Sequence, residues 1–335
     1  MIRKKLFFVL FVLFPALLFG QKTDSIRYPK FKVTEILVSN YQHAFEEGTN
    51  QTSVKNSRID LKGNFTENIS YRGQLTLKDN GNFNVLDLSA TFMPVQGLSL
   101  TFGQTAIPLF NPYVAGPSSM MFATRPYIGD YFLSTRDVGL HANYQFMAGK
   151  IPVSVEAGIF NGNTINKSEW RKDKNMSYGA RLQLGAMQGA RATVKFYDYP
   201  TSGELHYFFY GADVRYEGDN WKIETEVINR DNRKDEKDDL LSYYVQGVYG
   251  FPLKKSWIFK NVLPAVRWDA LKKGHEESGM DVNRLTVGVG FGLTQKYFSS
   301  LLRLNYERCF VNREIDILGN EKDSDKLIVG LILVL

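Results

Sequence analysis

Cysteine, histidine and long apolar runs are scarce in this chain, and each scarcity excludes a class of protein. Cys309 is the single cysteine among 335 residues, which excludes an internal disulfide framework and a cysteine-based zinc site. Four histidines are present, and His275-Glu276 is followed by no second histidine at the spacing of a zinc-binding HExxH helix. After residue 20 no apolar run reaches about eighteen residues, the length that indicates a membrane-spanning helix.

The first twenty residues have the order of a secretory signal. Residues 1–5 carry three positive charges, an apolar run covers 6–19, and the small residue Gly20 follows. This run of about fourteen residues is shorter than the roughly twenty that span a membrane. Leu18 departs from the small-residue pattern of a cleavage site, whereas Gly20 fits it. We therefore expect a signal peptide over 1–20, cleaved after Gly20, and no lipid anchor, because no cysteine follows the cut.

The mature chain is only mildly basic. The formal charge of +6 falls to +3 when Arg3, Lys4 and Lys5 leave with the signal, which argues against a nucleic-acid partner. Aromatic residues make up 14% of the chain, a high share for a soluble enzyme. Scattered histidines and the lack of a GxSxG motif give no nucleophile with a nearby base, so we expect neither an enzyme nor a cofactor.

From Lys30 onward, apolar and polar residues alternate with a period of two. In 284–291, Leu285, Val287 and Val289 share one face, while polar residues and glycines occupy the other. This alternation is typical of β-strands that separate an apolar from a polar environment. It predicts strands over 30–44, 54–65, 68–79, 84–94, 97–104, 136–147, 151–160, 176–186, 189–198, 203–217, 219–230, 239–251, 256–270, 281–293, 296–310 and 324–335.

The strand lengths and the connections favour a transmembrane barrel over a soluble sandwich. Most predicted strands have about ten to fourteen residues, as tilted membrane strands do. Short turns follow the even strands and longer polar loops follow the odd ones, the pattern of outer-membrane barrels with both termini in the periplasm. We therefore predict an all-β fold, a transmembrane antiparallel β-barrel of about sixteen strands over 21–335. Aromatics near strand ends are expected to form the interfacial girdles, for example Tyr41, Phe160, Tyr178, Trp221 and Trp257.

Four stretches of the first half resemble the phosphate-selective porin family of Gram-negative outer membranes. They are SRIDLKGNFTENISYRGQLTL (57–77), LDLSATFMPVQGLSLTFGQTAIPLF (86–110), STRDVGLHANYQF (134–146) and VEAGIFNGN (155–163). The resemblance implies a homotrimeric porin of sixteen strands, with a loop folded into the pore and basic residues along it. The long third external loop, Thr105 to Thr135, is where such a constriction loop belongs.

The polar face of the strands gives the candidate lumen. Its basic residues are Arg58, Lys62, Arg72, Lys78, Arg181, Arg191, Lys195, Arg215, Lys222, Arg267, Arg284 and Arg303. Its acidic residues are Asp60, Asp137, Glu156, Asp213, Glu224, Glu226, Asp269 and Glu307. The excess of basic residues favours anions in a narrow, low-dielectric lumen. The pore-lining residues selected for anion contact are Arg58, Lys62, Arg72, Arg125, Arg181, Arg191 and Lys195.

Each of these charges has a structural alternative, because opposite charges on neighbouring strands stabilise a sheet without binding a solute. The predicted turns place Asp60 opposite Arg72 and Arg284 opposite Glu307. The cations expected to be less compensated are Arg58 with Lys62, and Arg181 with Arg191 and Lys195. The predicted constriction loop carries no charge from 107 to 124, unlike the arginine ladders of phosphate-specific members.

The function expected from the sequence is passive diffusion of small hydrophilic solutes across an outer membrane, with a mild preference for anions such as phosphate. Alternatives are a general non-selective porin, a structural or adhesin barrel, and an outer-membrane barrel hydrolase. The charged run 229–239 suggests a solvated external loop more than a calcium or phosphate site. The expected partners are membrane lipid and lipopolysaccharide, small anions or other hydrophilic solutes, and two further copies of the chain.

Overall fold

The computed structural model describes residues 28–78, 81–111, 116–132, 135–165, 176–186, 188–200, 205–274, 278–316, 318 and 320–335. The predicted signal peptide and His275-Glu276 lie outside these residues. In the described part of the chain, helices are too short to cross a membrane.

Antiparallel strands make up most of the described chain. They are β1 (Lys30–Ala44), β2 (Thr49–Ser53), β3 (Arg58–Asn64), β4 (Ile69–Leu77), β5 (Phe83–Val95), β6 (Leu98–Ala106), β7 (Arg136–Ala148), β8 (Ile151–Phe160), β9 (Ser177–Gly185), β10 (Gly189–Pro200), β11 (His206–Glu217), β12 (Trp221–Asn232), β13 (Leu240–Tyr249), β14 (Phe251–Pro252), β15 (Asn261–Lys273), β16 (Val282–Gly292), β17 (Leu301–Val311) and β18 (Lys326–Val334). Three short helices are α3 (Tyr127–Tyr131), η2 (Glu236–Asp238) and α4 (Asn320–Asp323).

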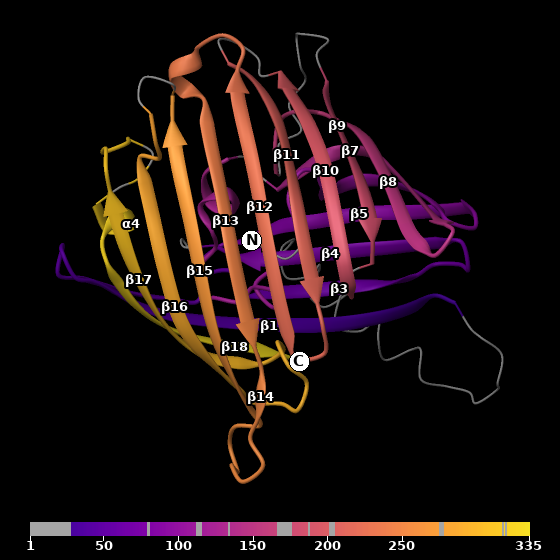
Figure 1. The fold of residues 1–335 in the computed structure, drawn as a ribbon. Coiled ribbons are helices and arrows are strands. Elements are labelled where there is room, and N and C mark those ends of the chain that lie inside the picture. Colours follow the sequence, from indigo (N-terminus) through magenta and orange to yellow (C-terminus); the bar gives the residue numbers. More distant parts are fainter. Residues whose placement is uncertain are drawn as a thin grey trace, which may run out of the picture.

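The strands close into one barrel (Figure 1). β18 pairs with β1 from Ile36–Val334 to Ala44–Lys326, so the sheet has no free edge there. Both β2 and β3 pair with β1, and both β13 and β14 pair with β15, so each couple counts as one interrupted strand. The described residues therefore form a sixteen-stranded antiparallel barrel, which confirms the predicted fold class.

The strand predicted over 54–65 begins earlier, at Thr49, and a kink at 54–57 divides it into β2 and β3. Asn56 there has a φ of 68°, a left-handed conformation that asparagine tolerates better than most residues. Ser57 Oγ stands in for a backbone partner, since it accepts from the amide of Val38 at 2.9 Å. The kink explains why the first connection is the tight turn 45–48 instead of the expected longer loop.

The remaining connections mostly alternate as predicted. The turn end of the barrel carries the short connections, and the loop end carries long ones such as 107–135 (the upper end in Figure 1). Two turn-end connections, 253–260 and 293–300, are longer than predicted, so β15 and β17 begin about five residues later than expected. Trp257, 87% exposed, lies in the first of them.

The outer surface of the barrel is apolar. On β10, Val194 and Phe196 point outward with 55% and 44% exposure, while Lys195 between them points inward and is 4% exposed. Such a surface belongs in lipid, where a charged side chain at mid-depth costs about 2–4 kcal/mol. Exposed aromatics lie near the strand ends, including Tyr41 and Tyr178.

Phe160 is an exception to the predicted aromatic girdles. It lies inside the barrel, fully buried. There the connection 107–135 and α3 pack against the inner wall in one apolar cluster. The connection contributes Ile107, Leu109, Phe110, Tyr127, Ile128 and Phe132, and the wall contributes Phe160, Tyr197, Phe209, Ile228, Leu240 and Leu271, among others. This packing fills the lumen beside β8–β16. The inner face of β1 lines two cavities toward its two ends, and Ile36 between them is buried in a second apolar cluster with Leu301 and Ile332.

Candidate functional site

The inner face of β9–β12 is a dense ionic network, which we call the packed wall. Asp213 of β11 lies 2.6 Å from Arg191 Nη2 and 3.0 Å from Lys195 Nζ, both on β10. Lys195 also pairs with Glu226 of β12. All four side chains are buried. Because each buried cation faces a buried carboxylate, the network stabilises the wall and presents little free charge.

Arg181 is compensated in the same way. Its Nη2 lies 2.6 Å from Glu156 Oε1, and its Nη1 donates to the carbonyl of Phe110 at 3.3 Å. The prediction that Arg181, Arg191 and Lys195 are less compensated is therefore wrong. The acids that neutralise them lie on neighbouring strands, and the sequence alone does not specify which diagonal each long side chain takes.

The predicted cross-strand pairs form, but along diagonals. Gln74 lies directly opposite Asp60, and Lys62 directly opposite Arg72. Arg72 nevertheless reaches Asp60 at 2.9 Å and, on its other side, Asp87 at 2.9 Å. The predicted turn pivot was displaced by one position, which shifts an antiparallel register by two residues and keeps every side chain on its predicted face.

Arg284 shows the same shift on the far wall. It lies directly opposite Cys309, while Thr286 lies opposite Glu307. Arg284 still reaches Glu307 at 3.3 Å and Asp269 at 2.7 Å. The predicted pair therefore forms diagonally here as well.

A contrasting arrangement, which we call the lysine row, crosses β1, β3 and β4. Lys32 lies directly opposite Lys62, and Lys62 directly opposite Arg72. Lys32 and Lys62 are exposed, and neither forms an ion pair with the described residues. Like charges placed directly opposite each other destabilise a sheet, so this row is held at a cost to folding.

The lysine row opens into a cavity of about 570 Å³, the lysine cavity. Beside the cations, an adjacent row of uncharged hydrogen-bonding side chains crosses from β3 to β6. Its members, in register, are Asn64, Ser70, Thr91 and Thr101. Thr91 and Thr101 share a hydrogen bond of 2.8 Å between their hydroxyls.

Arg58, another predicted site residue, lies on the same inner face closer to the loop end. Its side chain is buried and donates to Gln74 Oε1 at 3.5 Å. It does not line the lysine cavity. The structure thus separates Arg58 from Lys62, which the sequence grouped together.

Three arginines of the far wall hold the connection 107–135 against it. Arg267 donates to the carbonyl of Thr124 at 2.9 Å, and Arg284 to that of Arg125 at 2.8 Å. Arg303 donates to the carbonyls of Phe122 and Met120, at 3.1 and 2.7 Å. These predicted lumen cations therefore bind main-chain oxygens of the connection.

The connection also depends on a glycine of β18. A Cβ at Gly330 would lie 2.9 Å from the Cβ of Ala123 and 2.7 Å from Asn40 Oδ1, closer than Cβ atoms approach other groups. The amide of Ala123 donates to Asn305 at 2.9 Å, which fixes the segment at this site. Gly330 therefore allows the connection to approach the wall closely.

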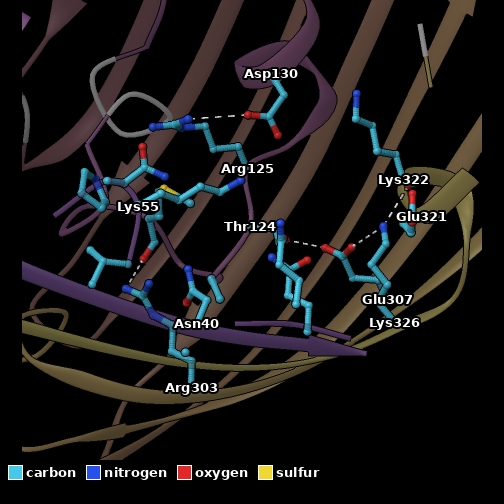
Figure 2. A pocket seen from close by; sticks show the side chains of 18 of the residues that line it. Asn40, Lys55, Thr124, Arg125, Asp130, Arg303, Glu307, Glu321, Lys322 and Lys326 are labelled. Atoms are coloured by element: carbon cyan, nitrogen blue, oxygen red, sulfur yellow. Dashed lines mark hydrogen bonds and ion pairs between the residues drawn. The ribbon is translucent and has the colours of Figure 1, made fainter. Parts of the chain in front are cut away.

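A second cavity of about 790 Å³, the amide cavity, lies between the connection and the wall formed by β1, β2 and β18 (Figure 2). Its cations include the predicted site residue Arg125, whose Nη1 lies 3.6 Å from Asp130. Lys322 also lines it, with Nζ 5.3 Å from the ring centre of Tyr131. Uncharged amides of β1 and β2 line it as well: Asn40, Gln42 and Gln51.

Sequence reasoning missed five cations that line the two cavities: Lys30, Lys32, Lys55, Lys322 and Lys326. Lys32 alternates with Phe31 and Val33 in a predicted strand, so the period-two rule was sufficient to find it. Lys322 lies in a loop-end connection, where no periodicity specifies the direction of a side chain. Within the described ranges, no cluster of three or more His, Cys, Asp or Glu side chains is arranged to hold a metal ion.

No protein-family model and no curated protein sequence matches the chain. Solved structures do. The outer membrane channel DcaP of Acinetobacter baumannii superposes with a TM-score of 0.64 at 10% identity, over 94% of this chain and 99% of that one. Salmonella typhi OmpF, in complex with daunomycin, gives 0.62 at 11% identity over 91% and 98%. An anion-selective porin from Comamonas acidovorans gives 0.59 at 12% identity over 91% and 99%.

At these identities the likeness is one of fold. It supports the porin part of the predicted resemblance, while the phosphate-selective branch stays a prediction. Together with the apolar exterior, it confirms the predicted outer-membrane location. The chain is an outer-membrane β-barrel with the fold of the porins.

Proposed function

We propose that the protein is a passive diffusion channel for small hydrophilic solutes that prefers anions. The observation that carries this proposal is the lysine row, in which Lys32 and Lys62 face the lysine cavity without carboxylate partners among the described residues. Cations along a narrow wall raise the local concentration of anions because the low-dielectric surroundings focus their field.

The proposed path runs along the inner face of β1. Asn40 and Gln42 of β1 line the amide cavity, and Lys30 and Lys32 line the lysine cavity nearer the turn end. The connection 107–135 narrows this path, because its apolar residues occupy the lumen beside β8–β16 and its Met121 packs against the apolar cluster that holds Ile36 between the two cavities. Its loop end would face outward and its turn end the periplasm, as in other outer-membrane barrels.

The finer parts of the proposal come from the sequence and from the outer surface of the barrel. Phosphate as the preferred anion and assembly as a homotrimer come from the sequence resemblance, and cleavage after Gly20 comes from the signal pattern. Contacts with lipid and lipopolysaccharide follow from the apolar exterior. The porin from Comamonas acidovorans that shares this fold is anion-selective, which agrees with the proposed anion preference.

A channel is favoured over a barrel hydrolase by the character of the lumen, which is arranged as ion pairs and unpaired lysines. Planar-bilayer recording of the purified protein tests the proposal. Under a potassium chloride gradient the reversal potential is expected to take the sign of chloride permeation. Exchange of chloride for phosphate then tests the finer preference. A cation-selective reversal potential, or no conductance, would contradict the proposed function.

A further inference from the structure

Uncharged amides of β1 and β2 line the amide cavity beside its charged side chains. Gln42 of β1 lies directly opposite Gln51 of β2, and both line the cavity. Neither side chain forms a hydrogen bond with the described residues, so their donors and acceptors are available to a solute. Asn40, two residues before Gln42 on β1 and on the same inner face, adds a third amide.

The lining of this cavity is basic on balance. It comprises six cationic and three anionic side chains. Glu307, one of the acids, is already occupied by Arg284 at 3.3 Å and Arg267 at 3.2 Å. Figure 2 shows Arg125 and Lys322 on different sides of this cavity, above Asn40. A bound solute would therefore meet cations on more than one side and the neutral hydrogen-bonding groups of β1 and β2.

The lysine cavity repeats the combination with different residues. Lys32 and Lys62 supply the charge, while Thr91 and Thr101 supply hydroxyls on the same wall. A simple inorganic anion uses the cations alone, and a neutral sugar uses the amides and hydroxyls alone. A small solute that carries both an anionic group and several hydroxyls uses both sets in each cavity.

We propose that the preferred solutes are hydroxyl-rich organic anions of the sugar-acid class, bound in turn by the amide cavity and the lysine cavity. This proposal rests on the proposed channel function. The neutral hydrogen bonds of each cavity are together expected to strengthen binding by about fivefold, which corresponds to about 1 kcal/mol. The lysines therefore make the channel prefer anions over cations. The amides and hydroxyls make it prefer hydroxyl-rich anions over simple ones.

Block of the single-channel chloride current tests the proposal with three small probes. Glucuronate carries both a carboxylate and hydroxyls, glucose carries only hydroxyls, and propionate carries only a carboxylate. Glucuronate is expected to block at concentrations about tenfold lower than either of the others, because it uses both sets of groups. Equal block by glucuronate and propionate would overturn the proposal.

Two variants identify the groups responsible. Gln42→Met with Gln51→Met removes the amides at similar size, and Thr91→Val with Thr101→Val removes both partners of one hydroxyl pair, an exchange expected to leave folding nearly unchanged. Each is expected to weaken glucuronate block about fivefold and to leave propionate block unchanged. The matched control Gln96→Met with Gln295→Met alters two exposed glutamines of turn-end connections and is expected to behave as wild type.

The reversal potential and the glucuronate block test the channel function and the sugar-acid preference separately. The reversal potential in potassium chloride reports the channel and its anion preference, whatever organic solute it takes. An anion-selective channel in which the glutamine and threonine variants leave glucuronate block unchanged would overturn the sugar-acid proposal while the proposed function stands.

Discussion

The packed wall and the lysine row carry the same kinds of cation in the same barrel, yet their surroundings differ. On the packed wall, Lys195 lies between Asp213 and Glu226 and is 4% exposed. In the lysine row, Lys62 lies between Lys32 and Arg72 and faces an open cavity. Charge on the lumen face is therefore a poor guide to solute contact by itself. The neighbours across the strand decide whether a cation is structural or available.

The largest expected effect comes from breaking the packed wall. Asp213→Ala leaves the buried Arg191 and Lys195 without their shared carboxylate. Removal of one partner of a buried ionic group costs about 3–5 kcal/mol, so we expect a marked loss of stability in urea unfolding followed by circular dichroism. Asp219→Ala, at an exposed turn position, is the control and is expected to change stability by less than about 0.5 kcal/mol. Equal stability of the two variants would contradict the structural role of this wall.

A smaller effect is expected where the connection 107–135 approaches β18. Gly330→Ala introduces a Cβ 2.9 Å from that of Ala123, and such overpacking costs about 1–3 kcal/mol. We expect lower stability and an altered single-channel conductance, because the displaced segment borders the amide cavity. Adding Ala123→Gly should restore part of both. Gly73→Ala, at a glycine with open space around it, is the matched control. Unchanged conductance in Gly330→Ala would show that the connection at Ala123 does not border the solute path.

A smaller difference between the lysine row and the packed wall is expected when the salt concentration is raised. The Debye length falls from about 10 Å at 0.1 M to about 3 Å at 1 M, so the field of the exposed lysines is screened at high salt. We expect the anion-over-cation permeability ratio to decline toward unity between these concentrations. Urea stability, which depends on buried pairs, should change little over the same range. A permeability ratio independent of salt would contradict an origin in Lys32 and Lys62.

The barrel was predictable from the sequence because the period-two pattern depends only on which residues meet lipid. The inward direction of Lys62 and Arg191 followed from it, and so did the closure of the last strand on the first. What did not follow was the compensation of each charge. A register shift of two residues keeps the face but changes the partner, as Asp60 and Arg72 show.

The apolar cluster inside the barrel also could not be predicted from the period-two pattern. Phe160 and Tyr197 occupy inward positions that a water-filled pore would leave polar, and they do so because the connection 107–135 packs on them. That packing joins segments far apart in the chain, so no local periodicity indicates it. The low charge of 107–124 was the available signal, since an uncharged segment is suited to burial.

The central claim is that the lysine row sets the anion preference, and one comparison tests it most directly. Lys32→Gln with Lys62→Gln removes two charges that face the lysine cavity, while Lys254→Gln with Lys255→Gln removes two exposed charges from the connection 253–260. Reversal potentials in planar bilayers under a potassium chloride gradient give the permeability ratio of each. We expect the first variant to lower the chloride-over-potassium ratio by about fivefold, the factor that corresponds to about 1 kcal/mol of electrostatic energy, and the second to leave it at the wild-type value. Equal ratios in the two variants would contradict the account.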